Sequence, residues 1–257
     1  MAEERMVCFI SGSGSGNGRG MARRMAEMGY DLALHHSGRD PSGATAIESE
    51  IKAMGCRAEI LTEDLSKPGS ALRLFRSFRE KFDRLDLFIA NAGVTRGSRI
   101  LDMSEETFDE VCDIDLKGTF FCVREAGLFM KEHGIGGSVV IISSNHSKRM
   151  WSGYSVYGSV KEALRRFTEY AAIEFAPFGV RVNCLAPGYI IREYDITPEQ
   201  RLNYYTDIPL KRRVLSSELA DWAVFLASGC AASVTGVTID IDGGARLLND
   251  SLDKYGL

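Results

Sequence analysis

The chain has 257 residues, of which 45% are hydrophobic and 26% charged, and its formal net charge is −4. These values are ordinary for a globular protein with a sizeable core. Basic clusters are short (residues 23–24, 165–166 and 211–213) and form no long stripe, which argues against a nucleic-acid partner. No apolar run approaches membrane-spanning length, and the first residues do not resemble a signal peptide, so we expect a soluble cytoplasmic protein without a membrane partner.

Six cysteines are scattered along the chain, without a C-x-x-C pair or a histidine at metal-ligand spacing. Most fall in apolar runs, where a free cysteine behaves as a small buried hydrophobe. This pattern favours a reducing compartment and predicts no metal site.

Short apolar runs alternate with amphipathic segments from end to end. The predicted strands cover residues 6–10, 31–35, 58–61, 85–90, 138–142, 181–185 and 237–241. The predicted helices include 43–54, 69–82, 105–132, 155–176 and 216–227. Strands that are apolar at consecutive positions are typical of parallel sheets buried on both faces. We expect an α/β protein with a doubly wound, mostly parallel sheet of about seven strands flanked by helices, in one domain over 1–257 with a lid around 188–214.

A glycine-rich turn with the sequence SGSGSGNGRG follows the first predicted strand at residues 11–20. It joins a buried strand to a helix that we expect to start near residues 19–21, which argues against a flexible linker. Glycines at this position let backbone N–H groups approach a pyrophosphate, whose charge the helix N-terminus offsets. The fingerprint G-x-G-x-x-G fails in every register, so the turn alone does not identify its ligand.

The second predicted strand ends in the sequence HHSGR at residues 35–39, with no acidic side chain to hold the ribose hydroxyls of NAD. A 2′-phosphate would meet no repulsion, and Ser37 and Arg39 could bind it. We therefore favour NADP, with NAD as the alternative. Arg39 is equally compatible with a solvated loop charge.

Tyr157 and Lys161 lie four residues apart in a predicted helix and therefore share one helix face. A tyrosine phenol ordinarily loses its proton near pH 10 and is a poor base at neutral pH. A cation about 4 Å away supplies roughly 4 kcal/mol at an effective dielectric constant near 20, but only about 1 kcal/mol in water. The pair can act as an acid/base unit only in a partly dry cleft, and taken alone it is equally compatible with a pair on the helix surface.

Several further motifs accompany the pair, in order and at regular separations. Together they resemble the short-chain dehydrogenase/reductase family over nearly the whole chain. The matching residues are Ser11-Gly12 through Gly16-Asn17-Gly18, Asp64, Asn91-Ala92-Gly93, Ser144, Tyr157 with Lys161, Pro187-Gly188 and Asp242-Gly243-Gly244.

This resemblance implies a Rossmann-like fold and a homotetramer. It implies that Tyr157 exchanges a proton with the substrate oxygen, that Ser144 positions that oxygen, and that Lys161 holds the nicotinamide ribose and makes the phenol more acidic. The nicotinamide would carry the hydride. The expected cofactor-binding residues are Ser11, Gly12, Ser15, Gly16, Asn17, Gly18, Ser37, Arg39, Asp64, Leu65, Asn91, Ala92, Gly93, Tyr157, Lys161, Pro187, Gly188 and Ile190.

The match breaks at three positions. Asn17 replaces an aliphatic residue between the turn glycines, and Arg192 replaces a threonine that family members often use to bind the carboxamide. Asp115 aligns with the asparagine that completes the family's catalytic tetrad. An ionised carboxylate there would stabilise Lys161 as a cation and oppose loss of the tyrosine proton, so we expect an active site with an altered pH profile.

Substrate pockets in such folds form at the carboxyl ends of the strands. The candidate substrate residues are Asn145, His146, Trp151, Tyr154 and Tyr189, with Val94, Thr95 and Arg96 nearby. Their mixture of polar and aromatic groups suits a sugar, polyol, oxoacyl compound or small cyclic ketone. We expect an NAD(P)-dependent oxidoreductase that interconverts a secondary alcohol and a ketone; the alternative is a non-catalytic dinucleotide-binding or regulatory protein on the same fold.

Overall fold

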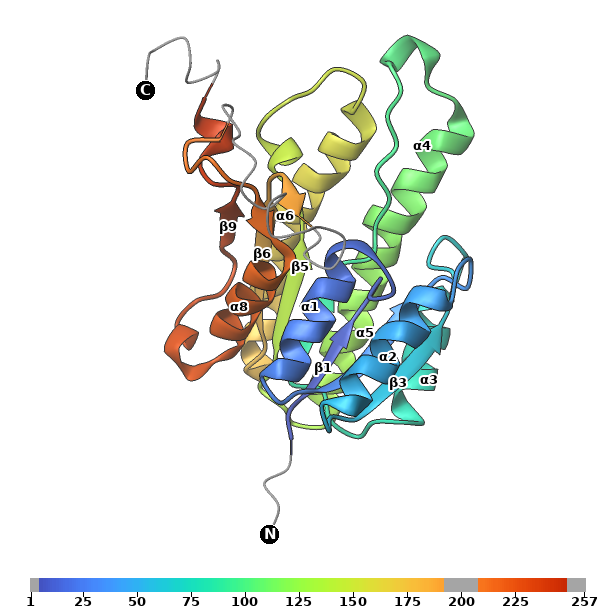
Figure 1. Cartoon of the computed structure of the whole chain (residues 1–257), viewed down its shortest axis with the longest axis vertical. Helices are drawn as coiled ribbons and strands as arrows, with labels where there is room; N and C mark the ends of the chain where they lie inside the picture. Colours follow the sequence, from blue (N-terminus) through green and yellow to red (C-terminus); the bar gives the residue numbers. More distant parts are fainter. Residues whose placement is uncertain (1–4, 192–207, 249–257) are drawn as a thin grey trace.

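A central sheet of seven parallel strands organises the computed structural model, which describes residues 5–191 and 208–248 (Figure 1). The strand order is β3-β2-β1-β4-β5-β6-β9, and every neighbouring pair is parallel. The strands are β1 (Val7–Ile10), β2 (Asp31–His36), β3 (Ala58–Thr62), β4 (Leu87–Ala90), β5 (Ser138–Ile142), β6 (Arg181–Pro187) and β9 (Thr238–Ile241). The predicted doubly wound α/β fold is confirmed.

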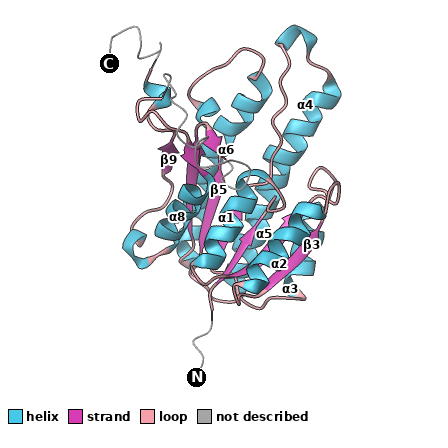
Figure 2. Cartoon of the chain, viewed as in Figure 1, coloured by secondary structure: helices cyan, strands magenta, loops and turns pink. Residues whose placement is uncertain are grey.

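Three helices cover each face of the sheet (Figure 2). One face carries α1 (Gly16–Glu27), α2 (Ser42–Ala53) and α8 (Ser216–Ala227); the other carries α3 (Ser70–Arg79), α5 (Thr119–Glu132) and α6 (Ser155–Phe175). All residues of β1, β4 and β5 are buried, because both of their faces lie under helices. Their continuous apolar sequences follow from this arrangement.

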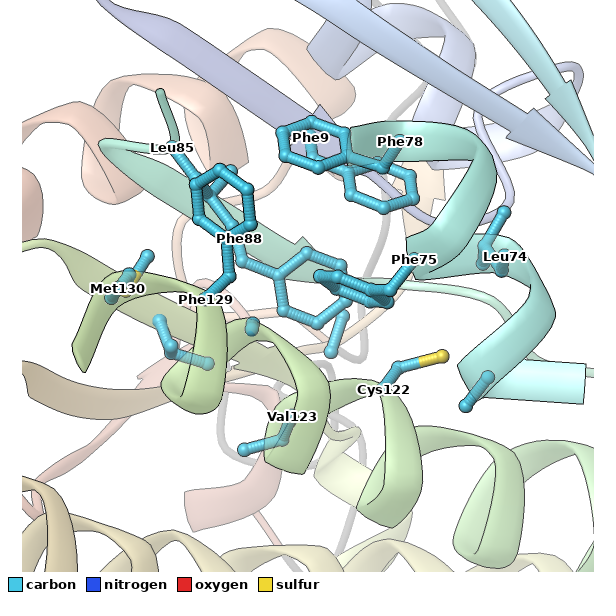
Figure 3. Close-up of a cluster of buried hydrophobic side chains, with 14 of the residues drawn as sticks. Phe9, Leu74, Phe75, Phe78, Leu85, Phe88, Cys122, Val123, Phe129 and Met130 are labelled. Carbon is cyan, nitrogen blue, oxygen red and sulfur yellow. The ribbon is translucent and has the colours of Figure 1, made fainter. Parts of the chain in front are cut away.

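The core between the sheet and the α3/α5 layer is rich in phenylalanine (Figure 3). Phe9 of β1 stacks on Phe78 of α3, with ring centroids 5.1 Å apart. Phe78 also meets Phe129 of α5 edge to face at 5.2 Å. These fully buried rings fasten both helices to the strand that leads into the glycine-rich turn.

The predicted helix over 105–132 is wrong in its middle. The segment consists of α4 (Glu105–Val111), a π-helical stretch (Cys112–Gly118) and α5. The sequence does not indicate this change of helix type, because residues 105–117 contain no glycine or proline. The wider turn directs Asp115 into the interior, where it is fully buried; such π segments frequently occur at functional sites.

Helix α1 also differs from the expectation, because it begins at Gly16 rather than near residues 19–21. The second half of the glycine-rich run is therefore the first turn of the helix. Other element boundaries differ from the predicted ones by a few residues at most, as expected where terminal turns fray.

The expected lid at 188–214 is described only at its two ends. Strands β7 (Ile190–Ile191) and β8 (Val214–Leu215) pair in parallel as a small second sheet. Residues 192–207, which include Arg192, lie outside the described part. Within residues 5–191 and 208–248, no helix is long and apolar enough to span a membrane.

Candidate functional site

The site lies where the order of successive strands along the sheet reverses. Strand β1 lies between β2 and β4, so the connections after β1 and β4 leave on opposite faces and open a crevice at their carboxyl ends. Two adjoining clefts occupy this edge. We call them the glycine-turn cleft and the Tyr157 cleft, and Asn17, Asn91, Gly93 and Thr95 line both.

Close packing around Gly12 shapes the glycine-rich turn. Asn91 donates from Nδ2 to the carbonyl oxygens of Ser11 and Gly12, at 3.0 Å each. A Cβ on Gly18 would lie 2.0 Å from the Gly12 oxygen and 2.7 Å from Asn91 Nδ2, so no side chain fits there. Glycine at position 18 therefore lets helix α1 approach the turn.

The start of α1 fits an anionic group. Its N-cap, Ser15, makes no side-chain capping hydrogen bond, and its first turn carries no acidic residue. The positive end of the helix dipole thus opens on the glycine-turn cleft, which Ser15, Gly16 and Asn17 line. The residues of the glycine-rich turn are therefore suited to bind a pyrophosphate.

Most of the expected cofactor-binding residues line one cleft or the other. The glycine-turn cleft has a volume of about 640 Å³, and its lining includes Gly12, Ser15, Gly16, Asn17, Ser37, Arg39, Asp64, Leu65, Asn91, Ala92 and Gly93. The Tyr157 cleft is lined by Tyr157, Lys161, Pro187, Gly188 and Ile190 among others.

Ser11 and Gly18 line neither cleft. Ser11 is buried, and its Oγ accepts hydrogen bonds from the backbone N–H groups of Asn91 and Ala92, at 3.0 Å each. It joins the ends of β1 and β4 beneath the turn, so its contribution is to the shape of the cleft.

His35 lies beneath the turn as well, a role that no sequence pattern indicated. Its Nδ1 accepts from Gly12 N–H at 3.0 Å, which leaves Nε2–H to donate to the Glu63 carbonyl at 2.8 Å. Burial lowers the pKa of His35 to about 4, outweighing the opposing effect of the Glu63 carbonyl. A neutral imidazole therefore links the glycine-rich turn to the end of β3.

Arg39 forms an ion pair. Its Nη1 lies 3.2 Å from Oε1 of Glu110 in α4, and Glu110 also holds Arg96 through bonds of 2.7 and 3.0 Å. Hydrogen bonds from Arg96 lower the pKa of Glu110 despite some burial, and Arg39 adds to the effect. Glu110 thus connects two cationic side chains that both line the glycine-turn cleft, an arrangement that no spacing in the sequence indicated.

Lys161 and Asp115 form a buried ion pair in the Tyr157 cleft. Lys161 Nζ lies 3.0 Å from Asp115 Oδ2 and donates to the Ile142 carbonyl at 3.3 Å. Asp115 Oδ1 accepts from Val94 N–H at 2.7 Å. Burial by itself would lower the pKa of Lys161, but the charge of Asp115 and the nearby Tyr157 raise it overall.

Space for this pair depends on Gly93. A Cβ at that position would approach Asp115 Oδ2 to 2.7 Å. Lys161 Nζ also lies 5.4 Å from the centroid of the Tyr157 ring, so the cation faces the phenol from one side. The partly dry setting that the tyrosine–lysine pair needs is present at Lys161, which is 4% exposed.

Ser144 enters the same cleft from the end of β5. Its Oγ accepts from His146 N–H at 3.2 Å, which leaves its own hydroxyl proton available to donate. The His146 ring lies beside Tyr157 and meets its ring edge to face, with centroids 5.3 Å apart. Asn145 is 3% exposed and lines neither cleft, so the structure places it behind the site.

A family model described as Enoyl-(Acyl carrier protein) reductase matches residues 12–246. A short-chain dehydrogenase/reductase of Armillaria gallica is 32% identical over 249 residues, covering 93% of this chain and 95% of the relative. The chain belongs to the short-chain dehydrogenase/reductase family. A 3-oxoacyl-[acyl-carrier-protein] reductase, FabG, of Staphylococcus aureus is 31% identical over 238 residues, covering 92% of this chain and 96% of its own.

Solved structures of the family resemble this fold. An acetoin dehydrogenase of Salmonella typhimurium has a TM-score of 0.87 at 29% identity, covering 96% of this chain and 99% of its own. An acetoin dehydrogenase of Enterobacter cloacae has a TM-score of 0.83 at 31% identity, covering 96% and 98%. Their likeness extends over the whole sheet, and the chain is an oxidoreductase of this family.

Proposed function

We propose that this protein transfers a hydride between NADP(H) and a secondary alcohol or ketone, with Tyr157 as the acid/base group. The observation that carries the proposal is the convergence of Ser144, Tyr157 and the buried Lys161–Asp115 pair in one cleft, which adjoins a glycine-rich turn suited to a pyrophosphate. The alternative, a non-catalytic binding protein, would not need a serine proton donor and a tyrosine–lysine pair to share the cleft.

Each residue of the Tyr157 cleft has a separate role in the proposed reaction. When bound, the nicotinamide supplies or accepts the hydride. The Ser144 hydroxyl donates a hydrogen bond to the substrate oxygen, and the Tyr157 hydroxyl gives that oxygen a proton during reduction. Lys161, held by Asp115 and the Ile142 carbonyl, keeps one further N–H for the ribose and places its charge beside the phenol.

Two features favour NADP over NAD. Strand β2 ends in His36, followed by Ser37, so no carboxylate stands at the position where an acid would bind the ribose of NAD. Ser37 and Arg39 line the glycine-turn cleft. Asp40 also lines it, but its Oδ1 already accepts from the Ser42 backbone and hydroxyl, at 3.0 and 2.6 Å.

We also propose one domain over the whole chain, a homotetramer and a cytoplasmic location. On α5, Phe120, Phe121 and Leu128 are 38–42% exposed, which suits an interface between subunits. On α6, Phe167, Ala171 and Phe175 pack against the core, and the exposed apolar residues are Tyr170 and Ile173. All six cysteines are free, as suits a reducing compartment. Light scattering after gel filtration tests the tetramer.

The test of the reaction uses the purified protein with NADPH and a panel of ketones, including acetoin and 3-oxoacyl thioesters. We expect NADPH oxidation that falls at least 1,000-fold in Tyr157→Phe, while NADPH still binds. The matched control is Tyr170→Phe on the same helix, about 20 Å further along its axis, which should leave turnover unchanged. Turnover that survives Tyr157→Phe would refute the mechanism.

A further inference from the structure

A continuous set of aromatic rings adjoins the proposed proton donor. We call His146, Trp151, Tyr154 and Tyr189 the aromatic wall. The His146 ring stacks on Trp151 with centroids 4.1 Å apart and meets Tyr154 edge to face at 5.1 Å. Trp151 in turn meets Tyr189 edge to face at 6.4 Å.

The wall meets the Tyr157 cleft at His146. At one end His146 contacts the Tyr157 ring at 5.3 Å. Beyond this contact His146, Trp151 and Tyr154 line a neighbouring cleft of about 1120 Å³. The cofactor-side residues Asn17, Asn91 and Gly93 line the Tyr157 cleft from the glycine-rich turn. A substrate whose oxygen reaches Ser144 and Tyr157 can therefore extend past His146 into the cleft that the wall lines.

Contacts from three directions hold the wall in place. Arg149 lies over the Trp151 ring at 5.1 Å and donates to the Ala245 carbonyl at 2.8 Å. Trp151 thus contacts both a guanidinium and an imidazole. The Tyr154 ring packs over Gly97, where an added Cβ would approach it to 3.3 Å, and the neighbouring Ser98 N–H donates to the Gly153 carbonyl at 2.7 Å. A rigid surface of this kind selects by shape, because it loses little conformational entropy on binding.

The wall is also uncharged near neutral pH. Burial lowers the pKa of His146, so its imidazole is neutral at pH 7. Flat neutral rings gain from offset or edge-to-face contact with another ring, by about two- to tenfold in affinity for each good contact. An open alkyl chain makes fewer such contacts and loses more rotational freedom.

We propose that the substrate subsite of this enzyme takes an uncharged ketone, or the matching alcohol, whose carbonyl lies in or directly beside a ring. This inference rests on the proposed function and narrows its substrate class. The ring lies against His146 and Trp151, while the carbonyl oxygen reaches Ser144 and Tyr157. An open-chain ketone of the same carbon number uses the same proton donors but leaves the wall largely uncovered.

The experiment compares ketones matched in carbon number: cyclohexanone with 3-hexanone, and acetophenone with 2-octanone. Wild-type protein and NADPH should give kcat/KM at least tenfold higher for the ring member of each pair. Trp151→Ala should reduce this preference to threefold or less, mainly by raising KM for the ring ketone, whereas Trp151→Phe should retain most of it. The control is Met54→Ala, an exposed residue at the end of α2 that lines neither the cleft beside the wall nor the Tyr157 cleft, which should leave both ratios unchanged.

Binding provides a second readout. The chain has two tryptophans, so Trp222→Phe leaves Trp151 as the only one. In a Tyr157→Phe background, where no NADPH forms, cyclohexanol added with NADP should then shift the Trp151 emission to shorter wavelength because it excludes water from the ring, and 3-hexanol at the same concentration should not.

The outcomes distinguish a failure of this inference from a failure of the proposed function. If acetoin or 3-oxoacyl thioesters turn over in a Tyr157-dependent way while the wild type prefers the open-chain partners, or shows no preference, the proposed function stands and this inference is overturned. If NADPH binds but no ketone in either panel is reduced, both are overturned.

Discussion

Replacing Asp115 by asparagine tests the buried ion pair most directly. Asparagine keeps the shape of the side chain and an oxygen for Val94 N–H, so the change is confined to the negative charge. At 3.0 Å between Lys161 Nζ and Asp115 Oδ2, Coulomb attraction is about 5 kcal/mol at an effective dielectric constant near 20. Removing one partner of a buried pair typically costs about 3–5 kcal/mol. We expect the free energy of unfolding to fall by that amount at pH 7.

The pH dependence should change as well. In the wild type the pKa of Lys161 is raised above its ordinary value of 10.5. The resulting stabilisation is fully present below pH 10.5 and is lost as the pH rises through the folded-state value. In Asp115→Asn the raising effects of the carboxylate are gone, and burial, the largest effect on the pKa of Lys161, outweighs the remaining effect of Tyr157. The pKa of Lys161 therefore falls below its ordinary value, and the unfolded state binds more protons. The stability of the variant should therefore rise between pH 7 and pH 10, while that of the wild type does not.

Urea unfolding followed by circular dichroism at pH 7, 8.5 and 9.5 measures both effects. Asp113→Asn is the matched control, because Asp113 belongs to the same π-helical stretch and pairs with Lys117 at 3.1 Å on the surface. An exposed pair contributes little, so this variant should lie within about 0.5 kcal/mol of the wild type. If Asp115→Asn is as stable as Asp113→Asn and shows the wild-type pH slope, the argument for a charged buried pair fails.

Three further predictions concern other parts of the molecule. Phe78→Ala should lower the free energy of unfolding by about 3–5 kcal/mol, because the ring is fully buried among other phenylalanines; a loss below 1 kcal/mol in urea unfolding would contradict this. Between pH 6.5 and 4 the unfolded state protonates His35 and the folded state does not, so acid should cost about 3 kcal/mol at this residue. That acid slope should be clearly shallower in His35→Gln, and an equal slope would argue against a neutral buried imidazole. Glu110→Gln breaks the ion pair of Arg39 and removes a nearby negative charge. Fluorescence titration should therefore show that NADPH binds severalfold more tightly, while the affinity for NADH changes little. An equal change in both affinities would show that Arg39 does not bind the 2′-phosphate.

The sequence by itself determined the fold and the composition of the site. Consecutive apolar residues, as in strand 138–142, are required only where helices cover both faces of a sheet. This pattern lies within a few neighbouring residues, so it can be recognised in the sequence. The ordered motifs around Ser144, Tyr157 and Lys161 could likewise be recognised, because a glycine-rich turn and an i,i+4 helical pair are encoded in neighbouring residues. They indicated which side chains share the site, but not how those side chains are oriented.

The tertiary structure decided the orientations and the long-range contacts. Periodicity predicts an ordinary helix around Asp115, whereas packing against Lys161 and Val94 accompanies a π-helical stretch there. Likewise, no local pattern could show that Glu110 holds Arg39 or that His35 supports Gly12. Each of these contacts joins segments far apart in the chain, and its strength depends on burial, a property that a side chain acquires only when the whole fold surrounds it.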